Sequence, residues 1–324
     1  MNAKIRVGIT MGDPSGIGPA VIAKALPKLA GLADFVIIGD NWVLNSARGR
    51  HACPVRENGR SQRFIDLKNV RRDGFQFGKI RAEYGRASIE YLDRALELLE
   101  DKELDCLVTA PISKEAASLS GFRYPGHTEY LACRAGVKDY AMLLLNKDMK
   151  ITPVTRHISL DRVPKELSRE LIFKNVCLAH KSLKCMFGIL RPRIVACGLN
   201  PHASDNGLIG DEEIRIIRPA LKKARNTRGI GADGPISADV AISMAAAGRY
   251  DCVIAMYHDQ AMIPLKLCGN NSGVNLTLGL PYARTSPLHG TAFDIASKFN
   301  LADPASLVAA TLTAIQCARN QKKG

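Results

Sequence analysis

Long apolar runs and paired cysteines are both missing from this sequence. No stretch approaches the ~18 apolar residues that a membrane-spanning helix needs, and Ala141–Leu145 is typical of its short apolar runs. The nine cysteines include no Cys-x-x-Cys pair, which excludes a zinc ribbon and favours reduced, buried thiols. The first residues contain no signal-peptide core. We therefore expect a cytoplasmic protein that has no membrane partner.

Aromatic residues are also few, at 6% of the chain, whereas positive charge is abundant. The formal net charge is +14, and residues 45–86 carry eleven Lys and Arg against four Asp and Glu. Such a segment could serve a non-catalytic anion or nucleic-acid binder. It has few of the aromatic side chains that stack on bases. A solvated basic face is therefore favoured, and we expect no nucleic-acid partner.

Strand-like apolar runs alternate with helical patterns along the 324 residues. Strands are expected at residues 5–10, 35–39, 104–109, 141–146, 151–155, 194–199 and 252–257. Helices are expected at residues 17–29, 87–102, 165–187, 211–225, 238–247 and 304–319. Residues 45–85 show no clear pattern. The length predicts about two domains, and strands separated by helices predict an α/β fold with mostly parallel sheets flanked by helices.

Three of the seven histidines come directly after strand-like runs: His157, His202 and His258. In such sheets ligands bind beyond the carboxyl ends of the strands. Three imidazoles at one sheet edge could bind one divalent metal ion and leave a coordination position open, as catalytic zinc sites do. Each histidine could instead be a polar residue that ends its strand. The residues alone leave these two interpretations equally supported.

Six separated segments are dense in glycine, proline, histidine and polar side chains. They are residues 12–19, 109–114, 126–129, 198–203, 255–260 and 273–281. Taken in order, they resemble the motifs of the 4-hydroxythreonine-4-phosphate dehydrogenase family of pyridoxal phosphate biosynthesis. The resemblance extends along essentially the whole chain. Residues 288–296 look like the nucleotide loop of isopropylmalate and isocitrate dehydrogenases, to which that family is similar in fold.

The resemblance implies a two-domain isopropylmalate-dehydrogenase-like fold with the active site in the interdomain cleft. Residues 1–125 and 273–324 would form the first domain, which contains both termini and the nucleotide loop. Residues 126–272 would form the second domain, which carries the metal ligands and the dimer contacts. The resemblance also implies a homodimer whose subunits share their active sites.

The activity that the resemblance implies is an NAD(P)-dependent oxidation of 4-phosphooxy-L-threonine. The product, 2-amino-3-oxo-4-phosphooxybutanoate, would lose CO₂ to give 3-amino-2-oxopropyl phosphate. One divalent metal ion per site, zinc or else cobalt or magnesium, would assist by lowering the pKa of the reacting hydroxyl group. A paralogue that oxidises D-threonate or D-erythronate 4-phosphate is the alternative enzyme.

The family's motifs assign a role to thirteen residues of this chain. His157, His202 and His258 would bind the metal ion. His127, Thr128, Lys266, Asn275 and Arg284 would contact the substrate, with Lys266 also a catalytic candidate. Asp259 and Asp239 would support the catalytic site, and His289, Gly290 and Asp294 would contact the nucleotide. Leu288 stands where the family usually has Asp, so the preference between NAD and NADP stays open, as do the general base and the native metal.

Overall fold

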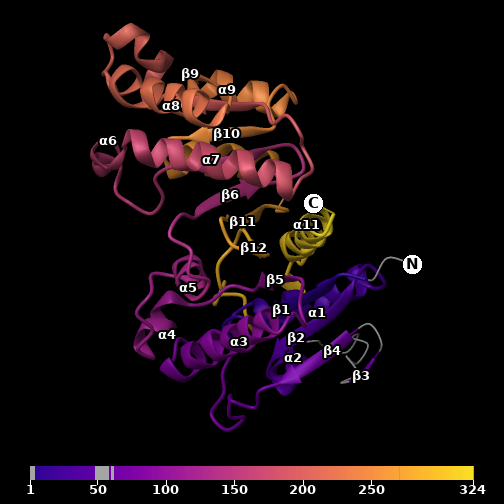
Figure 1. Cartoon of the computed structure of the whole chain (residues 1–324). Helices are drawn as coiled ribbons and strands as arrows, with labels where there is room; N and C mark the ends of the chain where they lie inside the picture. The colour runs from indigo at the N-terminus through magenta and orange to yellow at the C-terminus, as the bar shows by residue number, and fades with distance from the viewer. Residues whose placement is uncertain (1–3, 48–57, 60–61, 270, 324) are drawn as a thin grey trace. The chain divides into compact units, whose positions relative to one another are not determined.

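The computed structural model describes residues 4–47, 58–59, 62–269 and 271–323. The basic segment expected at residues 45–86 therefore lies partly outside the described residues. The chain divides into two compact units (Figure 1): unit 1 is residues 1–134 with 281–322, and unit 2 is residues 135–280 with 323–324. Each unit contains a mostly parallel sheet flanked by helices, so the predicted α/β class is confirmed.

The sheet of unit 1 has the strand order β3-β4-β2-β1-β5-β12. Its strands are β1 (Arg6–Thr10), β2 (Asp34–Gly39), β3 (Asn58–Gly59), β4 (Gln62–Asp66), β5 (Cys106–Thr109) and β12 (Ala283–Pro287). All neighbours from β4 to β12 are parallel, and only the short β3 is antiparallel. Every residue of β5 and β12 is buried, as is typical of parallel strands covered on both faces.

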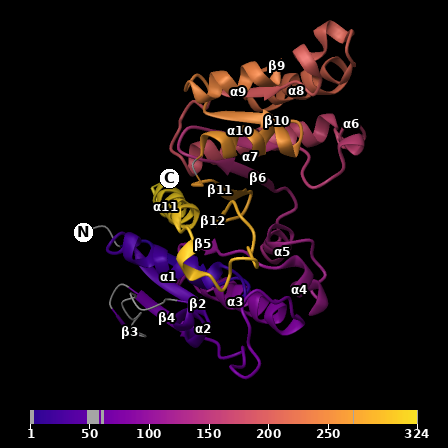
Figure 2. The same ribbon diagram turned by 180° about the vertical axis from the view of Figure 1, so that it is seen from behind.

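Helices from both ends of the sequence cover this sheet. They are α1 (Gly18–Leu29), α2 (Asn41–Ser46), α3 (Ala82–Glu100), α4 (Lys114–Leu119), α5 (His127–Arg134) and α11 (Ala305–Gln321). The helix α3 packs on β1, β2 and β5, and buries Tyr84, Tyr91 and Leu92 at helical spacing. The helix α11 packs on α1, β5 and β12 (Figure 2). The last part of the chain therefore completes unit 1.

The sheet of unit 2 has the strand order β11-β6-β7-β10-β8-β9. Its strands are β6 (Ala141–Leu145), β7 (Lys150–Pro153), β8 (Ile194–Cys197), β9 (Ala232–Ile236), β10 (Cys252–Ala255) and β11 (Val274–Leu278). The four strands β7, β10, β8 and β9 are parallel neighbours, whereas β6 runs antiparallel to both β7 and β11. The carboxyl ends of β7, β10 and β8 therefore lie side by side.

The helices of unit 2 begin with α6 (Val163–Glu166) and α7 (Arg169–Cys185). The others are α8 (Arg218–Arg228), α9 (Ala238–Ala246) and α10 (His258–Cys268), with short turns η2 (Leu160–Arg162), η3 (Pro201–Gly207), η4 (Glu213–Ile217) and, in unit 1, η5 (Phe299–Leu301). The helix expected at residues 165–187 is present as α7, but its first residues belong to the separate short helix α6. Ser168 interrupts the expected helix, because its hydroxyl accepts a hydrogen bond from the Leu171 N–H and so begins α7 as a new helix.

Among the residues that the structure describes, no helix is both long enough and apolar enough to cross a membrane. No disulfide joins the cysteines among those residues, and Cys106, Cys197 and Cys252 are buried in strands as expected.

The turn between β1 and α1 contains a fully buried carboxyl group. Asp13 Oδ1 accepts hydrogen bonds from the Ser15 backbone N–H at 2.9 Å and from the Ser15 hydroxyl at 3.0 Å. Asp13 Oδ2 has no hydrogen-bond partner among the residues that the structure describes. Burial raises the pKa of Asp13 to about 6, although the hydrogen bonds from Ser15 and Gly16 act in the opposite direction.

The same turn is bonded to two loops that are distant in sequence. The Ile17 N–H donates to the Thr291 carbonyl at 2.8 Å, in the loop where nucleotide contacts are expected. The Gly78 N–H donates to the Ser15 carbonyl at 2.8 Å, and the Ser15 hydroxyl donates to the Lys79 carbonyl at 2.6 Å. The ionisation of Asp13 therefore affects a junction of three segments.

We predict that Asp13→Asn removes part of the pH dependence of stability. Because the folded pKa of about 6 exceeds the ordinary value of 3.8, the native state binds more protons than the unfolded state between these values. The wild type should therefore lose free energy of unfolding as the pH rises from about 4 to 6, by up to about 3 kcal/mol from this group.

Urea unfolding of both proteins at several pH values measures this difference. The stability of the wild type relative to Asp13→Asn should fall across that pH range. A constant difference would show that the carboxyl group ionises normally in the folded protein.

Candidate functional site

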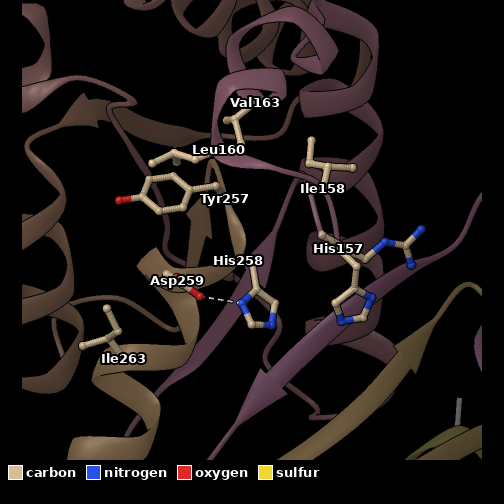
Figure 3. A pocket seen from close by; sticks show the side chains of 9 residues that line it. His157, Ile158, Leu160, Val163, Tyr257, His258, Asp259 and Ile263 are labelled. Atoms are coloured by element: carbon tan, nitrogen blue, oxygen red, sulfur yellow. Dashed lines mark hydrogen bonds and ion pairs between the residues drawn. The ribbon is translucent and has the colours of Figure 1, made fainter.

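A pocket of about 380 Å³ lies in unit 2, beyond the carboxyl ends of β7 and β10. Figure 3 shows His157 and His258 side by side there, with apolar side chains of the following turn nearby. Residues Arg156, His157, Ile158, Leu160, Val163, Tyr257, His258, Asp259 and Ile263 line it. Two of the three histidines singled out in the sequence are therefore neighbours, at the sheet edge where ligand sites of this fold class form.

His157 and His258 have the geometry of a two-imidazole donor set. Their ring centroids are 5.5 Å apart, with the ring planes inclined at 48°. His258 Nδ1 lies 2.7 Å from Asp259 Oδ1 (Figure 3). When Nδ1 carries the proton that faces this carboxylate, Nε2 keeps its lone pair for a metal ion, and the ring orientation is fixed.

The backbone holds the two histidine-bearing strand ends together. The Thr155 hydroxyl and the Thr155 N–H both donate to the Met256 carbonyl, at 2.8 and 3.2 Å. Thr155 precedes His157 by two residues, and Met256 precedes His258 by two residues. The proximity of the two rings therefore follows from the pairing of β7 with β10 and from its continuation past both strands.

The third histidine lies on a different part of the same unit. His202 follows β8 in the turn η3, is exposed, and has a left-handed backbone with φ = 54°. The described residues contain no group of three or more His, Cys, Asp or Glu side chains close enough to hold a metal ion. Within one chain, the structure thus brings His157 and His258 together and leaves His202 outside that pair.

The backbone around His202 is unusual. The five residues from His202 to Asn206 all have φ between 44° and 69°. Left-handed helical backbone costs about 1–2 kcal/mol for each residue that has a side chain. Ser204 compensates in part, because its Oγ accepts a hydrogen bond from the Gly207 N–H at 3.2 Å. Nothing in the residue pattern of this segment predicted five such conformations in succession.

Asp239, expected to support the site, faces His202. It lies in the first turn of α9, and the Ser237 hydroxyl donates to its Oδ1 at 2.5 Å. The pKa of Asp239 is lowered first by this hydroxyl, then by the Val240 N–H, and also by the charge of His202. Asp239 and Asp259 are therefore each associated with one of the predicted metal ligands.

A second polar site lies in unit 1, around Arg284. Arg284 is in β12, its residue is only 2% exposed, and its Nη2 donates to the Thr109 hydroxyl at 2.5 Å. Burial lowers the pKa of Arg284 to about 10, while Tyr282 and Glu129 act in the opposite direction. A buried cation loses the stabilisation that water gives it, so negative charge nearby stabilises it.

His127 and Thr128, at the start of α5, contribute to the same polar site. Burial and the nearby charge of Arg284 lower the pKa of His127 well below its usual value. The imidazole is therefore neutral at physiological pH. Its Nε2 is buried and has no hydrogen-bond partner among the described residues. Thr128 is 8% exposed. The neutral ring nitrogen of His127 thus remains for a ligand that brings a hydrogen-bonding group close to the guanidinium of Arg284.

The other two predicted substrate-contacting residues, Lys266 and Asn275, lie on different elements. Lys266 is an exposed residue in the last turn of α10. Asn275 is in β11, 9% exposed, and its Oδ1 is buried with no partner within the described part of the chain. These two belong to unit 2, whereas Arg284 belongs to unit 1.

The expected nucleotide residues lie in an exposed loop after β12. His289, Gly290 and Asp294 are all exposed, and His289 Nδ1 is 2.9 Å from the Gly290 carbonyl. Nothing lies within 4 Å of a Cβ placed on Gly290. Thr109, which positions the guanidinium of Arg284, had no role in the sequence prediction, although its place at the end of a buried strand was a usable signal.

Comparison with known proteins identifies the family to which this chain is similar. The family model described as pyridoxal phosphate biosynthetic protein PdxA matches residues 31–314. The chain is 43% identical to the 4-hydroxythreonine-4-phosphate dehydrogenase of Sulfurihydrogenibium sp. (strain YO3AOP1), over 98% of this chain and all of that one. It is 42% identical to the D-threonate 4-phosphate dehydrogenase of Salmonella typhimurium, over 90% and 92% of the two chains.

Solved structures agree with this relationship. The 4-hydroxythreonine-4-phosphate dehydrogenase of Klebsiella pneumoniae superimposes with a TM-score of 0.85 and 37% sequence identity, covering 98% of this chain and 100% of that one. The resemblance seen in the six motifs is therefore confirmed along the whole chain: the protein belongs to the PdxA family of oxidoreductases.

Proposed function

We propose that this protein oxidises 4-phosphooxy-L-threonine with NAD or NADP and a divalent metal ion, in pyridoxal phosphate biosynthesis. The observation that carries the proposal is the pair of facing imidazoles, His157 and His258, with Asp259 behind one of them. The full-length relatives named for this reaction support it. We also propose that the protein is cytoplasmic.

The donor set fits a divalent metal ion. Two imidazole rings face one pocket, and Asp259 directs the Nε2 of His258 toward a ligand. His157 and His258, completed by His202, would hold zinc, or else cobalt or magnesium. A bound divalent ion would lower the pKa of the substrate hydroxyl and stabilise the negative charge that develops on its oxygen.

The substrate's phosphate group matches the site around Arg284. A buried guanidinium favours a dianion, and the neutral His127 offers a hydrogen bond without adding a competing positive charge. Thr128 would donate its hydroxyl to the same ligand, and Lys266 and Asn275 would contact the substrate as a point charge and an amide. Binding at the phosphate would orient the C3 hydroxyl at a distance from the anchoring groups.

Oxidation at C3 would give 2-amino-3-oxo-4-phosphooxybutanoate, a β-keto acid that loses CO₂ to form 3-amino-2-oxopropyl phosphate. In this chemistry Asp259 holds the proton on Nδ1 of His258, and Asp239 orients His202 by its charge. Lys266 is the catalytic candidate that contacts the substrate directly. His289, Gly290 and Asp294 would contact the nucleotide, where the open space around Gly290 lets a ligand approach the backbone.

We further propose that the enzyme is a homodimer with shared active sites. The separation of His202 from the His157–His258 pair supports this, because no set of three such ligands forms among the residues described in one chain. His202 of the partner subunit would then complete the donor set. We also propose the domain division expected from the sequence, residues 1–125 with 273–324 and residues 126–272.

D-threonate 4-phosphate is a second candidate substrate. The Salmonella typhimurium relative with that name is 42% identical, against 43% for the Sulfurihydrogenibium relative. The two substrates share the phosphate and the C3 hydroxyl, and they differ in the group at C2, an amine in one and a hydroxyl in the other. The residues assigned above serve both.

The test is NAD(P)H formation from each of the two substrates, with and without a chelator. We expect turnover of 4-phosphooxy-L-threonine that the chelator stops and that added Zn²⁺, Co²⁺ or Mg²⁺ restores. Turnover of D-threonate 4-phosphate alone would make that compound the substrate and would leave the assignment of the site residues unchanged. Chelator-resistant turnover would exclude the metal, and inactivity on both substrates would overturn the proposal.

Subunit mixing tests the shared site. His202→Ala and His258→Ala should each be inactive and poor in bound metal. A 1:1 mixture that has exchanged subunits should recover about a quarter of the wild-type activity. About half of the dimers would be mixed, and each mixed dimer would contain one intact donor set and one that lacks two ligands. If the exchange is verified by mass spectrometry and no activity returns, His202 and His258 of each site come from the same chain.

A further inference from the structure

Gln260 bonds to both strand ends that lead to the histidines of unit 2. It lies in the first turn of α10 and is 9% exposed. Its Oε1 accepts a hydrogen bond from the Met256 N–H at 2.8 Å, two residues before His258. Its Nε2 donates to the Gly198 carbonyl at 2.9 Å, four residues before His202. One buried side chain therefore connects the end of β10 to the end of β8.

Glu213 holds the next two peptide groups of the same segment. It is fully buried at the start of η4. Its Oε1 accepts hydrogen bonds from the N–H groups of Leu199 and Asn200, both at 2.8 Å. Its Oε2 accepts one from the Asn200 side-chain amide at 3.0 Å. Three successive residues before His202 are thus each held by a side chain from elsewhere in the unit.

Close packing leaves this segment little freedom to shift. A Cβ on Gly198 would lie 2.9 Å from Ala203 Cα and 3.0 Å from Glu213 Oε1, so the turn folds back against the residue that Gln260 holds. Pro201 then restricts the backbone immediately before His202. The left-handed run begins at His202 itself. Such a backbone persists only where its surroundings hold it in place.

We infer that Gln260 is a positioning residue for the metal ligands, because it fixes the two strand ends that lead to His202 and His258, and that Glu213 completes this clamp. The inference rests on the proposed function, because it takes the histidines as metal ligands. Both polar groups of the Gln260 amide are used for backbone atoms, and the two backbone segments lead to different ligands. Misplacement of either segment would move one imidazole away from the other donors.

Co²⁺ binding to the metal-stripped, full-length protein tests this inference. Gln260→Glu keeps an acceptor for the Met256 N–H, but it has no donor for the Gly198 carbonyl. Gln260→Met removes both hydrogen bonds at similar volume and without charge. We expect each variant to raise the Kd for Co²⁺ by about 10- to 100-fold, and to alter the visible absorption bands that report the geometry around bound Co²⁺.

Asn175→Asp is the matched control. Asn175 is 5% exposed in α7, and its amide donates to the Leu171 carbonyl at 2.8 Å. Its replacement makes the same chemical change as Gln260→Glu, away from the histidine segments. It should lower the Tm of the metal-free protein by a similar amount, with the Kd and spectrum of Co²⁺ unchanged. Glu213→Gln, which keeps an acceptor for two N–H groups, should weaken Co²⁺ binding less than Glu213→Ala.

Two results separate the possible failures. If the wild type binds Co²⁺ and Gln260→Met binds it with the same Kd and spectrum, the positioning role is wrong and the proposed function stands. If the wild type itself binds no Co²⁺, the metal site of the proposed function is wrong and the positioning role falls with it. Asn175→Asp could also lose as much Co²⁺ binding as Gln260→Glu does. In that case a general loss of stability would explain the effect, and the inference would be overturned.

Discussion

The adjacency of β7, β10 and β8 in one parallel sheet is the constraint on which the candidate metal site depends. Parallel neighbours place their carboxyl ends at the same edge, so residues far apart in sequence come together once the strand order is set. His157 and His258 follow directly paired strands and lie side by side. His202 follows β8, the next strand along, in a turn of left-handed backbone, and it forms no three-ligand group with that pair among the described residues.

In unit 1 the candidate site depends instead on a buried positive charge. Arg284 is buried, donates a hydrogen bond to the Thr109 hydroxyl at the end of β5, and has the neutral imidazole of His127 nearby. Burial of a cation costs free energy that a ligand anion can offset. The same burial keeps His127 neutral and shifts Asp13 toward the protonated state. Unit 1 therefore contains three ionisable groups whose pKa values are shifted mainly by burial.

Much of the fold could be predicted from the sequence, because buried parallel strands such as β5, β8 and β10 are short runs of apolar residues and the helices between them are amphipathic. The strands β11 and β12 were not predicted, since they contain Asn275, Thr277 and Arg284, polar residues that strands rarely bury without a partner. The helix α10 was not predicted either, because Pro264 interrupts its helical pattern.

The proximity of His157 and His258 could be predicted, because each follows a strand of the same sheet. The anchoring roles of Thr109, Glu213 and Gln260 could not be predicted, because they depend on which distant backbone groups the fold brings near.

The way in which the chain returns to unit 1 after forming unit 2 has a consequence for how the protein is made. All strands and helices of unit 2 come from the stretch 135–280, whereas unit 1 requires β12 and α11 from residues 281–322. During synthesis the central stretch leaves the ribosome whole before the first unit has its last strand and its covering helix. Domains generally fold as units as they emerge. The segment made first must therefore wait for the segment made last, and until then the edge of β5 that pairs with β12 is left open to other strands.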